Sequence, residues 1–217
     1  MLRVAIIQPV QGRTPSTDTR DWAPDSPFDV LMDGLSPHDR SRSYLISRAL
    51  IEFPEAEAFL WIDDDTEATR DQADALALTM EADGSDLVTG VYVCRHAAKR
   101  GRLALNFNVR FNGEHDMTLV FGEGGSPYPI VACGFGFVLT HRRMFERSDA
   151  PRANYTNNEG KTFPGRAYFL PLVHDGEHLG EDRSFCLRNQ GARMLVDTRV
   201  CVGHAGHTLK SVLEAMQ

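Results

Sequence analysis

The chain has 217 residues, of which 42% are hydrophobic and 24% charged, a composition typical of a globular protein with a full hydrophobic core. Its formal net charge of −7 argues against a broadly basic surface for nucleic acid, although residues 95–102 form a local basic cluster that suits an anion. No stretch reaches membrane-spanning length and the N-terminal apolar run is too short for a signal peptide, so we expect a cytoplasmic protein without a membrane span.

The first part of the chain alternates between apolar runs and amphipathic segments. Residues 3–8 are predicted as a strand, and residues 11–35, rich in Asp, Pro, Ser, Thr and Gly, as a long loop. A helix is predicted over residues 37–53, where apolar side chains recur at i, i+4 and i+7 before Pro54 ends the pattern. A wholly apolar strand is predicted at residues 58–62.

A second helix is predicted to begin after Thr69, which opens a capping-box pattern, and to end at Gly84. Residues 87–94 are typical of a buried strand. Apolar and polar residues alternate over residues 104–111, which predicts a half-buried antiparallel strand, and residues 117–121 are its candidate partner.

The second part of the chain is predicted to be richer in strands. Residues 129–139 are predicted as one strand, broken at residues 133–136, and a short helix is predicted over residues 140–147. Residues 148–178 show no clear period, so we expect a second long loop there with a short extended piece at residues 168–170.

The last predicted elements are a helix that begins at residues 180–182 and ends at Gly191, a strand over residues 194–202, and a short terminal helix. The four cysteines are far apart and lie among apolar residues, so we expect small buried side chains rather than a zinc site. The order of the elements predicts a single α/β domain whose sheet is mostly parallel with an antiparallel element.

Three consecutive aspartates, Asp63, Asp64 and Asp65, directly follow the apolar strand at residues 58–62. Ligands of α/β proteins gather at the carboxyl ends of strands, so these acids mark a candidate binding edge. Strand alternation would turn Asp63 and Asp65 one way and Asp64 the other. Adjacent carboxylates repel unless a cation or proton lies between them, so a divalent metal with oxygen ligands is the simplest partner at neutral pH.

Four features occur in a recognisable order: the three aspartates, the segment Gly134-Phe135-Gly136, the helix start Gly180-Glu181-Asp182, and the late segment Val196-Asp197-Thr198 followed by Gly203-His204. Together they resemble the GT-A class of glycosyltransferases, close to compact, family 2-like members of bacterial or phage type. The resemblance covers roughly residues 3–204, and it implies a nucleotide-sugar-dependent, hexosyltransferase-like enzyme of a bacterial or phage-infected host cell.

The fold that the resemblance implies is a single Rossmann-like, nucleotide-binding GT-A domain over residues 1–217, with a mixed sheet flanked by helices. Residues 1–100 would form the half that binds the nucleotide-sugar donor. Residues 101–217 would form the acceptor and catalytic half.

For the metal, the resemblance implies that Asp65 is a ligand, that His204 is a further ligand, and that Asp63 lies on the metal or near the ribose. Asp64 would be a middle, donor-side residue of variable role. Carboxylate, imidazole and phosphate ligands suit Mn²⁺ or Mg²⁺, which would shield the charge of a departing nucleoside diphosphate. Taken alone, His204 would be a surface histidine in a glycine-flanked turn.

For catalysis, the resemblance implies that Asp182 is the general base that deprotonates the acceptor hydroxyl and that Glu181 contacts the acceptor. Acids at a helix start also stabilise the helix dipole, which is the structural alternative. Gly134 and Gly136 would let the backbone approach the sugar or acceptor, with Phe135 as a stacking platform, although a bulge in a core strand explains them as well. Inversion or retention at the sugar stays open.

For the donor, the residues that end the first strand, Gln8, Pro9 and Val10, would lie where the nucleotide base rests. Arg42 would reach the nucleotide and Arg95 the diphosphate or the sugar, although both are also compatible with ordinary surface arginines. The implied donor is a UDP-sugar or GDP-sugar. The acceptor would be a glycan, a glycolipid headgroup or a modified base in DNA.

Two other functions compete with this one. A sugar nucleotidyltransferase of related fold usually carries a glycine-rich basic loop after its first strand, and residues 11–15 match that loop poorly. A non-catalytic protein that binds carbohydrate or metal would have kept only the scaffold. The intact set of Asp63, Asp65, Asp182 and His204 argues against that third hypothesis.

Overall fold

The computed structural model describes residues 2–9, 29–33, 38–94, 104–109, 119–157, 160–204 and 206–215. Val10, Arg95, the basic cluster at residues 95–102 and most of the first predicted loop lie outside the described residues. Within the described ranges, no helix combines the length and the apolar composition that a membrane span needs.

The fold is built on one mixed sheet, and eight strands of it lie in the described residues. Their order across the sheet is β2 (Asp29–Asp33), β1 (Val4–Pro9), β3 (Ala58–Ile62), β8 (Phe137–His141), β5 (Leu87–Val91), β13 (Met194–Cys201), β7 (Pro127–Cys133) and β6 (Phe107–Val109). Only β8 and β7 run against the other six, because both pair antiparallel with their neighbours on either side. Of the seven pairings between neighbouring strands, three are parallel and four are antiparallel, so the sheet is mixed as expected but less parallel than predicted.

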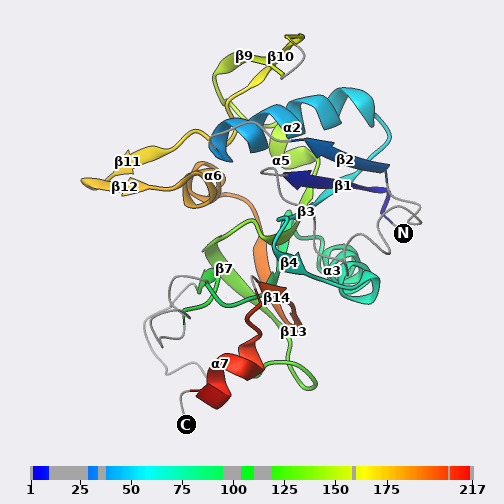
Figure 1. The fold of residues 1–217 in the computed structure, drawn as a ribbon, viewed down its shortest axis with the longest axis vertical. Helices are drawn as coiled ribbons and strands as arrows, with labels where there is room; N and C mark the ends of the chain where they lie inside the picture. The colour runs from blue at the N-terminus through cyan, green and yellow to red at the C-terminus, as the bar shows by residue number, and fades with distance from the viewer. Residues whose placement is uncertain are drawn as a thin grey trace.

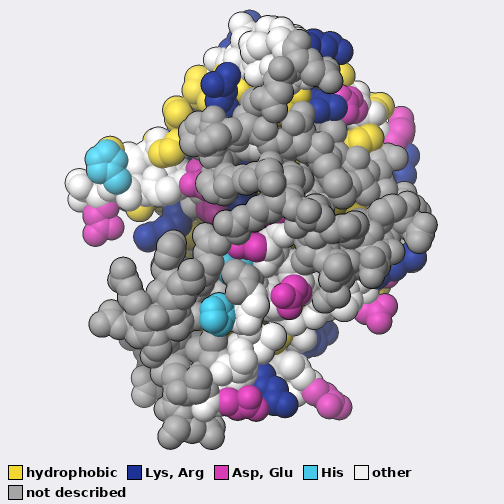
Figure 2. Space-filling model, in the orientation of Figure 1, with side chains coloured by type: hydrophobic (Ala, Val, Ile, Leu, Met, Phe, Trp, Pro, Cys, Tyr) yellow, Lys and Arg dark blue, Asp and Glu magenta, His cyan; other side chains and the backbone are white. Residues whose placement is uncertain are grey.

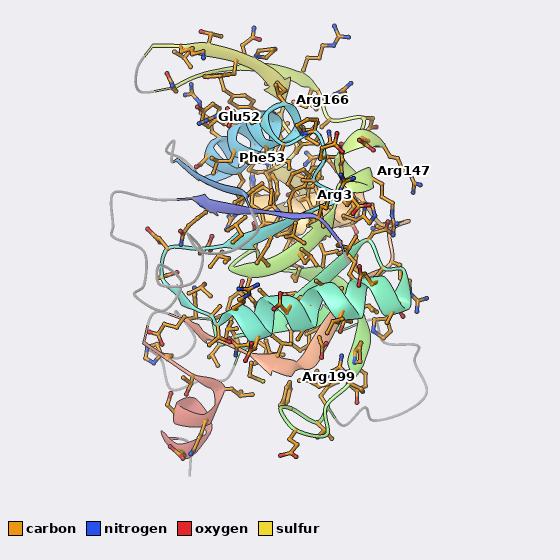
Figure 3. The ribbon with its side chains drawn as sticks, turned by 90° about the vertical axis from the view of Figure 1, so that its right-hand side faces the viewer. Arg3, Glu52, Phe53, Arg147, Arg166 and Arg199 are labelled. Atoms are coloured by element: carbon orange, nitrogen blue, oxygen red, sulfur yellow. The ribbon has the colours of Figure 1, made fainter. Side chains whose placement is uncertain are left out.

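The neighbouring strands β1 and β3 send alternate side chains into two separate cores. Ile7 and Trp61 belong to the core that lies under α2 (His38–Glu52), α5 (Arg143–Glu146) and α6 (Glu181–Arg188). Ile6 and Leu60 belong to the core under α3 (Arg70–Asp83) on the other face. Strands covered on both faces are apolar throughout, which explains the unbroken hydrophobic runs in the sequence. The result is a three-layer α/β structure (Figures 1 and 3).

Both helices predicted in the first part of the chain are confirmed. The helix expected over residues 37–53 is α2, and it differs from the prediction by one residue at each end. In α3 the capping box is formed, because Thr69 and Gln72 satisfy each other's backbone N–H groups. Gly84 ends this helix in the left-handed region with φ of 70°.

The strand predicted over residues 129–139 is in fact two strands, β7 and β8, in different places in the sheet. They run in the same direction but are separated by β5 and β13, so residues 134–136 carry the chain across the sheet instead of forming a bulge in one strand. The helix expected from residue 140 begins at Arg143, because Thr140 and His141 extend β8.

The prediction of a long loop over residues 148–178 is wrong, because this segment forms two β-hairpins. The first, β9 (Arg152–Thr156) with β10 (Thr162–Arg166), packs over α2 (Figures 1 and 3). The second, β11 (Leu172–His174) with β12 (Glu177–Leu179), projects from the body beside α6 (Figure 1). Asp175 and Gly176 both have positive φ, 49° and 81°, as the tightest hairpin turns require.

Smaller differences concern the ends of elements. Residues 168–169 form a turn in place of the expected extended piece, α6 ends at Arg188 before Gly191, and residues 29–33 of the first predicted loop are β2. Residues 119–121 form no strand, and β6 pairs with β7.

The two remaining elements are the short pair β4 (Thr66–Glu67) with β14 (Gly203–His204) and the terminal helix α7 (Leu209–Ala215). All four cysteines are free thiols, and Cys133 and Cys186 are buried.

Candidate active site at the strand ends

The three aspartates lie where β3 gives way to a turn. Asp63 N–H donates a hydrogen bond to Gly136 O at 3.0 Å, and Thr66 N–H donates one to Asp63 O at 3.1 Å. The sequence predicts that strand alternation sets the direction of the three aspartate side chains. This prediction does not hold, because Asp64 and Asp65 lie in a turn. Instead, Asp63 faces Arg42 of α2, and Asp65 faces His204 of β14.

Arg42 is a buried cation that joins three acidic side chains from two distant segments. Its Nη2 donates to both Asp63 oxygens at 2.8 and 3.1 Å, and its Nη1 donates to Glu181 Oε1 at 3.0 Å. Asp182 Oδ1 is 3.2 Å from the same Nη1. The Arg42 side chain is only 3% exposed, and its guanidinium lies 5.9 Å from the centroid of the Phe135 ring. One guanidinium therefore holds the end of β3 against the start of α6.

Asp182 lies in the first turn of α6, with Gly180 as the helix N-cap. Its Oδ2 accepts a hydrogen bond from Phe135 N–H at 3.1 Å, whereas Oδ1 has no aligned hydrogen bond with a described residue. Loss of solvent raises the pKa of Asp182 to about 7; Arg42 opposes this rise, and the nearby Glu181 and Asp63 carboxylates add to it. A carboxyl that titrates near neutral pH is suited to accept a proton during a reaction.

Asp65 and His204 are brought together by the pairing of β4 with β14, in which His204 lies opposite Thr66. The His204 Nε2 atom is 3.3 Å from Asp65 Oδ1, and its Nδ1 is 3.2 Å from Val93 O. Burial opposes the charging of His204, but the Asp65 carboxylate and the Val93 carbonyl outweigh it and raise the pKa of His204 above its usual value. The Val93 contact fixes the ring so that Nε2 points at Asp65.

The segment Gly134-Phe135-Gly136 is shaped by Tyr92, a residue that sequence reasoning missed. A Cβ atom at Gly134 or Gly136 would come within 2.6 or 2.9 Å of the Tyr92 hydroxyl, so both positions need glycine. Gly136 N–H donates to that hydroxyl at 2.9 Å, and the Tyr92 ring lies 4.8 Å from the His204 ring. Tyr92 therefore links the segment to His204.

The Phe135 ring does not lie at the surface, so its predicted role as a stacking platform does not fit. The ring is fully buried and packs edge-on against Trp61, Phe169 and Phe185. The contribution of Phe135 to the site is its backbone N–H, which bonds to Asp182. Nothing in the local sequence reports this role, because it depends on where α6 packs.

At the end of β1, Gln8 and Pro9 are buried, and Val10 lies outside the described residues. The Gln8 side-chain amide is 0% exposed, yet neither Nε2 nor Oε1 has a hydrogen-bond partner among the described residues. A buried, unsatisfied amide costs free energy, so a native protein keeps one only where something else satisfies it.

The residues at this edge have the chemistry of a divalent metal site that is completed by a ligand. Among the described residues, no three His, Cys, Asp or Glu side chains converge closely enough to hold a metal by themselves. The Asp65–His204 pair supplies one carboxylate and one oriented imidazole. Mg²⁺ and similar ions are commonly bound by one or two carboxylates together with substrate phosphates and water, so the pair fits such an ion. On the face of the molecule drawn in Figure 2, acidic side chains lie near the middle.

Comparisons with known proteins give likeness in structure alone. No protein family model and no curated protein matches the chain. The crystal structure of A197 from STIV matches with a TM-score of 0.62 at 14% identity, over 94% of this chain and 85% of A197. The crystal structure of GalNAc-T7 with UDP, GalNAc and Mn²⁺ matches with a TM-score of 0.51 at 9% identity, over 94% of this chain and 44% of GalNAc-T7.

At such low identities the likeness concerns the arrangement of the chain, which agrees with the mixed sheet and its flanking helices. The chain has the GT-A fold of glycosyltransferases.

Proposed function

We propose that this chain is a metal-dependent glycosyltransferase that moves a sugar from a nucleoside diphosphate sugar, a UDP-sugar or a GDP-sugar, to a hydroxyl group of an acceptor. The observation that carries the proposal is the arrangement at the strand ends. There, Arg42 holds Asp63 and the acids of α6 together, beside the oriented Asp65–His204 pair. The GT-A fold supports it, because ligands of such sheets bind at this edge.

Asp65 and His204 would hold Mn²⁺ or Mg²⁺ in this proposal. The bound ion would shield the negative charge that develops on the departing diphosphate. For the protein, the requirement is that Asp65 stays ionised and that His204 is neutral at Nε2, with Nδ1–H directed at Val93 O. Metal and proton therefore compete for the same imidazole nitrogen.

Asp182 is the general base in this proposal. It accepts the proton of the acceptor hydroxyl as that oxygen attacks the sugar, so it must be ionised before the reaction. Arg42 favours the ionised form, whereas loss of solvent and the neighbouring Glu181 favour the protonated form. The balance leaves a base that is ionised above about pH 7 and basic enough to take a proton. Glu181, also bound to Arg42, would contact the acceptor.

Arg42 has a different role from the nucleotide contact expected from the sequence. Its guanidinium is buried and already bonded to Asp63 and Glu181, so we propose that it positions these acids and does not bind the donor directly. Asp63, held in place by Arg42, and the neighbouring Asp64 would face the donor.

Gln8 and Pro9 are the described residues that we propose for the nucleotide base. The donor and acceptor of the Gln8 amide, which find no partner among the described residues, support this proposal because a planar base presents matching groups. Val10 and Arg95 stay in the proposal on the sequence alone. The backbone at Gly134 and Gly136 would border the sugar.

The test is the release of nucleoside diphosphate from a panel of UDP-sugars and GDP-sugars in the presence of Mn²⁺, with water as the default acceptor. The proposal expects release that EDTA abolishes. Binding without any release would favour a non-catalytic protein. Release of pyrophosphate from a nucleoside triphosphate and a sugar phosphate would favour the nucleotidyltransferase. Steeply salt-dependent binding to DNA would point to a modified base as the acceptor.

A further inference from the structure

Tyr92 contacts both sides of the candidate site. It directly follows β5 and is only 5% exposed. Its ring lies 4.8 Å from the His204 ring, and its hydroxyl oxygen accepts a hydrogen bond from Gly136 N–H at 2.9 Å. The ring therefore supports one half of the Asp65–His204 pair, while the hydroxyl supports the segment that borders Asp182.

The hydrogen bond to Asp182 comes from the residue next to the one that Tyr92 holds. Phe135 N–H donates to Asp182 Oδ2 at 3.1 Å, and the following N–H, that of Gly136, donates to the Tyr92 hydroxyl. Only one Cα–C unit lies between these two nitrogens, so a change in the direction of one N–H group also moves the other. The position of the donor to Asp182 thus depends on the Tyr92 hydroxyl.

The segment is also packed directly against this hydroxyl. A Cβ atom at Gly134 would lie 2.6 Å from the hydroxyl oxygen, whereas the next nearest atom, Cζ of the same tyrosine, would be 3.6 Å away. The hydroxyl oxygen alone therefore excludes a side chain at Gly134. Without that oxygen there would be room for a methyl group, which makes the contact testable by itself.

The carbonyl side of Gly136 is held separately. Gly136 O accepts hydrogen bonds from Asp63 N–H and from Thr66 Oγ1, both at 3.0 Å. Loss of the Tyr92 hydroxyl would release the N–H side of the segment while the carbonyl side stays bonded. We therefore expect a local shift of Phe135 N–H and no unfolding of the segment.

We propose that Tyr92 is a positioning residue for the reaction, whose hydroxyl keeps the 134–136 segment where its backbone donates to Asp182. This inference rests on the proposed function for the role of Asp182 as the base. Tyr92 acts through the segment and does not touch the substrate. Its ring and its hydroxyl have separable tasks, because only the ring packs on His204 and only the hydroxyl bonds to Gly136.

The expected consequence is a change in the proton affinity of Asp182. The hydrogen bond from Phe135 N–H lowers the pKa of Asp182, against the burial that raises it. In Tyr92→Phe the Gly136 N–H loses its acceptor, so the segment relaxes, the bond to Asp182 weakens and the pKa of Asp182 rises further. The variant leaves in place the other charged or titratable groups that act on this carboxyl: Arg42 on α2, Asp63 after β3, Glu181 on α6 and Cys133 on β7.

The first measurement is the titration of the Asp182 carboxyl in the free protein, followed by ¹³C NMR and assigned from the signal that Asp182→Asn lacks. Tyr155→Phe is the matched control, because Tyr155 is also 5% exposed and its hydroxyl donates to Arg166 O at 3.0 Å. We expect the midpoint to move to higher pH by about half a pH unit or more in Tyr92→Phe and to stay in place in Tyr155→Phe. Equal midpoints in the wild type and Tyr92→Phe would overturn the inference.

The second measurement separates catalysis from donor binding. With Mn²⁺ present and water as the acceptor, kcat for release of nucleoside diphosphate at pH 7 should fall about tenfold in Tyr92→Phe and remain unchanged in Tyr155→Phe. Calorimetry should find the affinity for UDP or GDP with Mn²⁺ unchanged, because the ring still packs on His204. A loss of nucleotide affinity as large as the loss of rate would contradict a role confined to the base.

The third measurement tests the packing contact through melting temperatures. Gly134→Ala should lower the melting temperature of the wild type, because the added methyl group meets the Tyr92 hydroxyl. The same change should cost clearly less in Tyr92→Phe. Equal costs in the two backgrounds would show that the segment is not packed on the hydroxyl, and the inference would fall.

These measurements also separate this inference from the proposed function. A wild type that releases no nucleoside diphosphate from any UDP-sugar or GDP-sugar removes the glycosyltransferase. The carboxyl titration needs neither substrate nor metal, so it still decides whether Tyr92 positions the donor to Asp182. Release by the wild type together with equal midpoints removes Tyr92 and leaves the glycosyltransferase.

Discussion

Two ionic clusters in this molecule are built on opposite plans. Asp197 in β13 is fully buried and faces one cation, Arg199. Its Oδ1 accepts from Arg199 N and Nε at 3.1 and 2.8 Å, and its Oδ2 accepts from Thr79 Oγ1 and Arg199 Nη2, both at 2.6 Å. Arg199 lies below α3 in Figure 3. At the strand ends, by contrast, Arg42 faces three carboxylates.

The difference appears in the pKa values. Burial opposes ionisation of Asp197, but the hydrogen bonds from Arg199 and Thr79 outweigh it and hold the pKa of Asp197 below its usual value. For Asp182 the one shared cation does not outweigh the loss of solvent, and its pKa rises to about 7. A balanced pair keeps its carboxylate ionised in the fold, whereas a cluster with surplus acid is costly unless a ligand or a proton relieves it. The comparison therefore separates a structural ion pair from a candidate active site.

The largest effect is expected on the transfer rate. Asp182→Asn keeps the shape of the side chain but removes the proton acceptor, so transfer should fall by about a thousandfold, within the range typical of general-base removal. Donor binding should be retained, because Asp182 does not touch the Asp65–His204 pair. Initial rates and calorimetric donor affinities measure the two effects. Asp74→Asn, an exposed acid on α3, is the control. Transfer by Asp182→Asn at the wild-type rate would remove the base assignment.

The next largest effect is expected on stability. Arg42→Met leaves three carboxylates without their shared cation, so the free energy of unfolding should fall by roughly 3–5 kcal/mol at pH 8. Arg199→Met should cost less, because it leaves one carboxylate that keeps its bond from Thr79. Adding Asp182→Asn to Arg42→Met should restore part of the loss, and urea unfolding measures it. Equal losses for the two arginines, with no recovery in the double variant, would contradict the distinction between the clusters.

A smaller effect concerns the metal. The raised pKa of His204 means that a proton competes with the ion until the pH exceeds that pKa. Over the range in which His204 is protonated, affinity for Mn²⁺ in the presence of nucleoside diphosphate should rise about tenfold per pH unit. Calorimetry at several pH values measures this. In His204→Gln the dependence should flatten along with a loss of affinity, and an unchanged slope would exclude His204 as a ligand.

The smallest effect is the pH dependence of stability. The pKa of Asp182 is about 7 in the fold against an ordinary value of 3.8. Its contribution to the free energy of unfolding is therefore full below pH 3.8 and is lost as the pH rises through 7. Asp182→Asn should remove that loss and raise the melting temperature relative to the wild type at pH 8, but not at pH 4. For Asp197, with its lowered pKa, the stabilisation is present above the ordinary value and is lost as the pH falls. Melting curves that show the same trend for Asp182→Asn and Asp197→Asn would contradict both assignments.

Local signals explain why much of the fold could be predicted. The capping box at Thr69 and the left-handed Gly84 set the ends of α3 through contacts within a few residues. The apolar run at β3 is fully buried on both faces, so its pattern survives folding unchanged. A signal was also present for the second hairpin, because Asp175-Gly176 is a typical two-residue hairpin turn. Its strands are only three residues long, too short to show a period.

The parts that the sequence could not predict depend on contacts between distant residues. Arg42 and Glu181 are 139 positions apart, and only the packing of α2 against α6 makes them an ion pair. The glycines at residues 134 and 136 are conspicuous in the sequence, but their cause is the Tyr92 hydroxyl on another strand end. The direction of Asp63 and Asp65 depends on a turn held by Gly136 O. In each case the residue type was visible and its partner was not.

The most direct test of the account is a calorimetric titration of the protein with UDP and GDP, each with and without Mn²⁺. The account predicts heat and a raised melting temperature for at least one nucleotide when Mn²⁺ is present, and neither for Asp65→Ala. No heat and no thermal protection with either nucleotide, or binding by Asp65→Ala equal to that of the wild type, would contradict it.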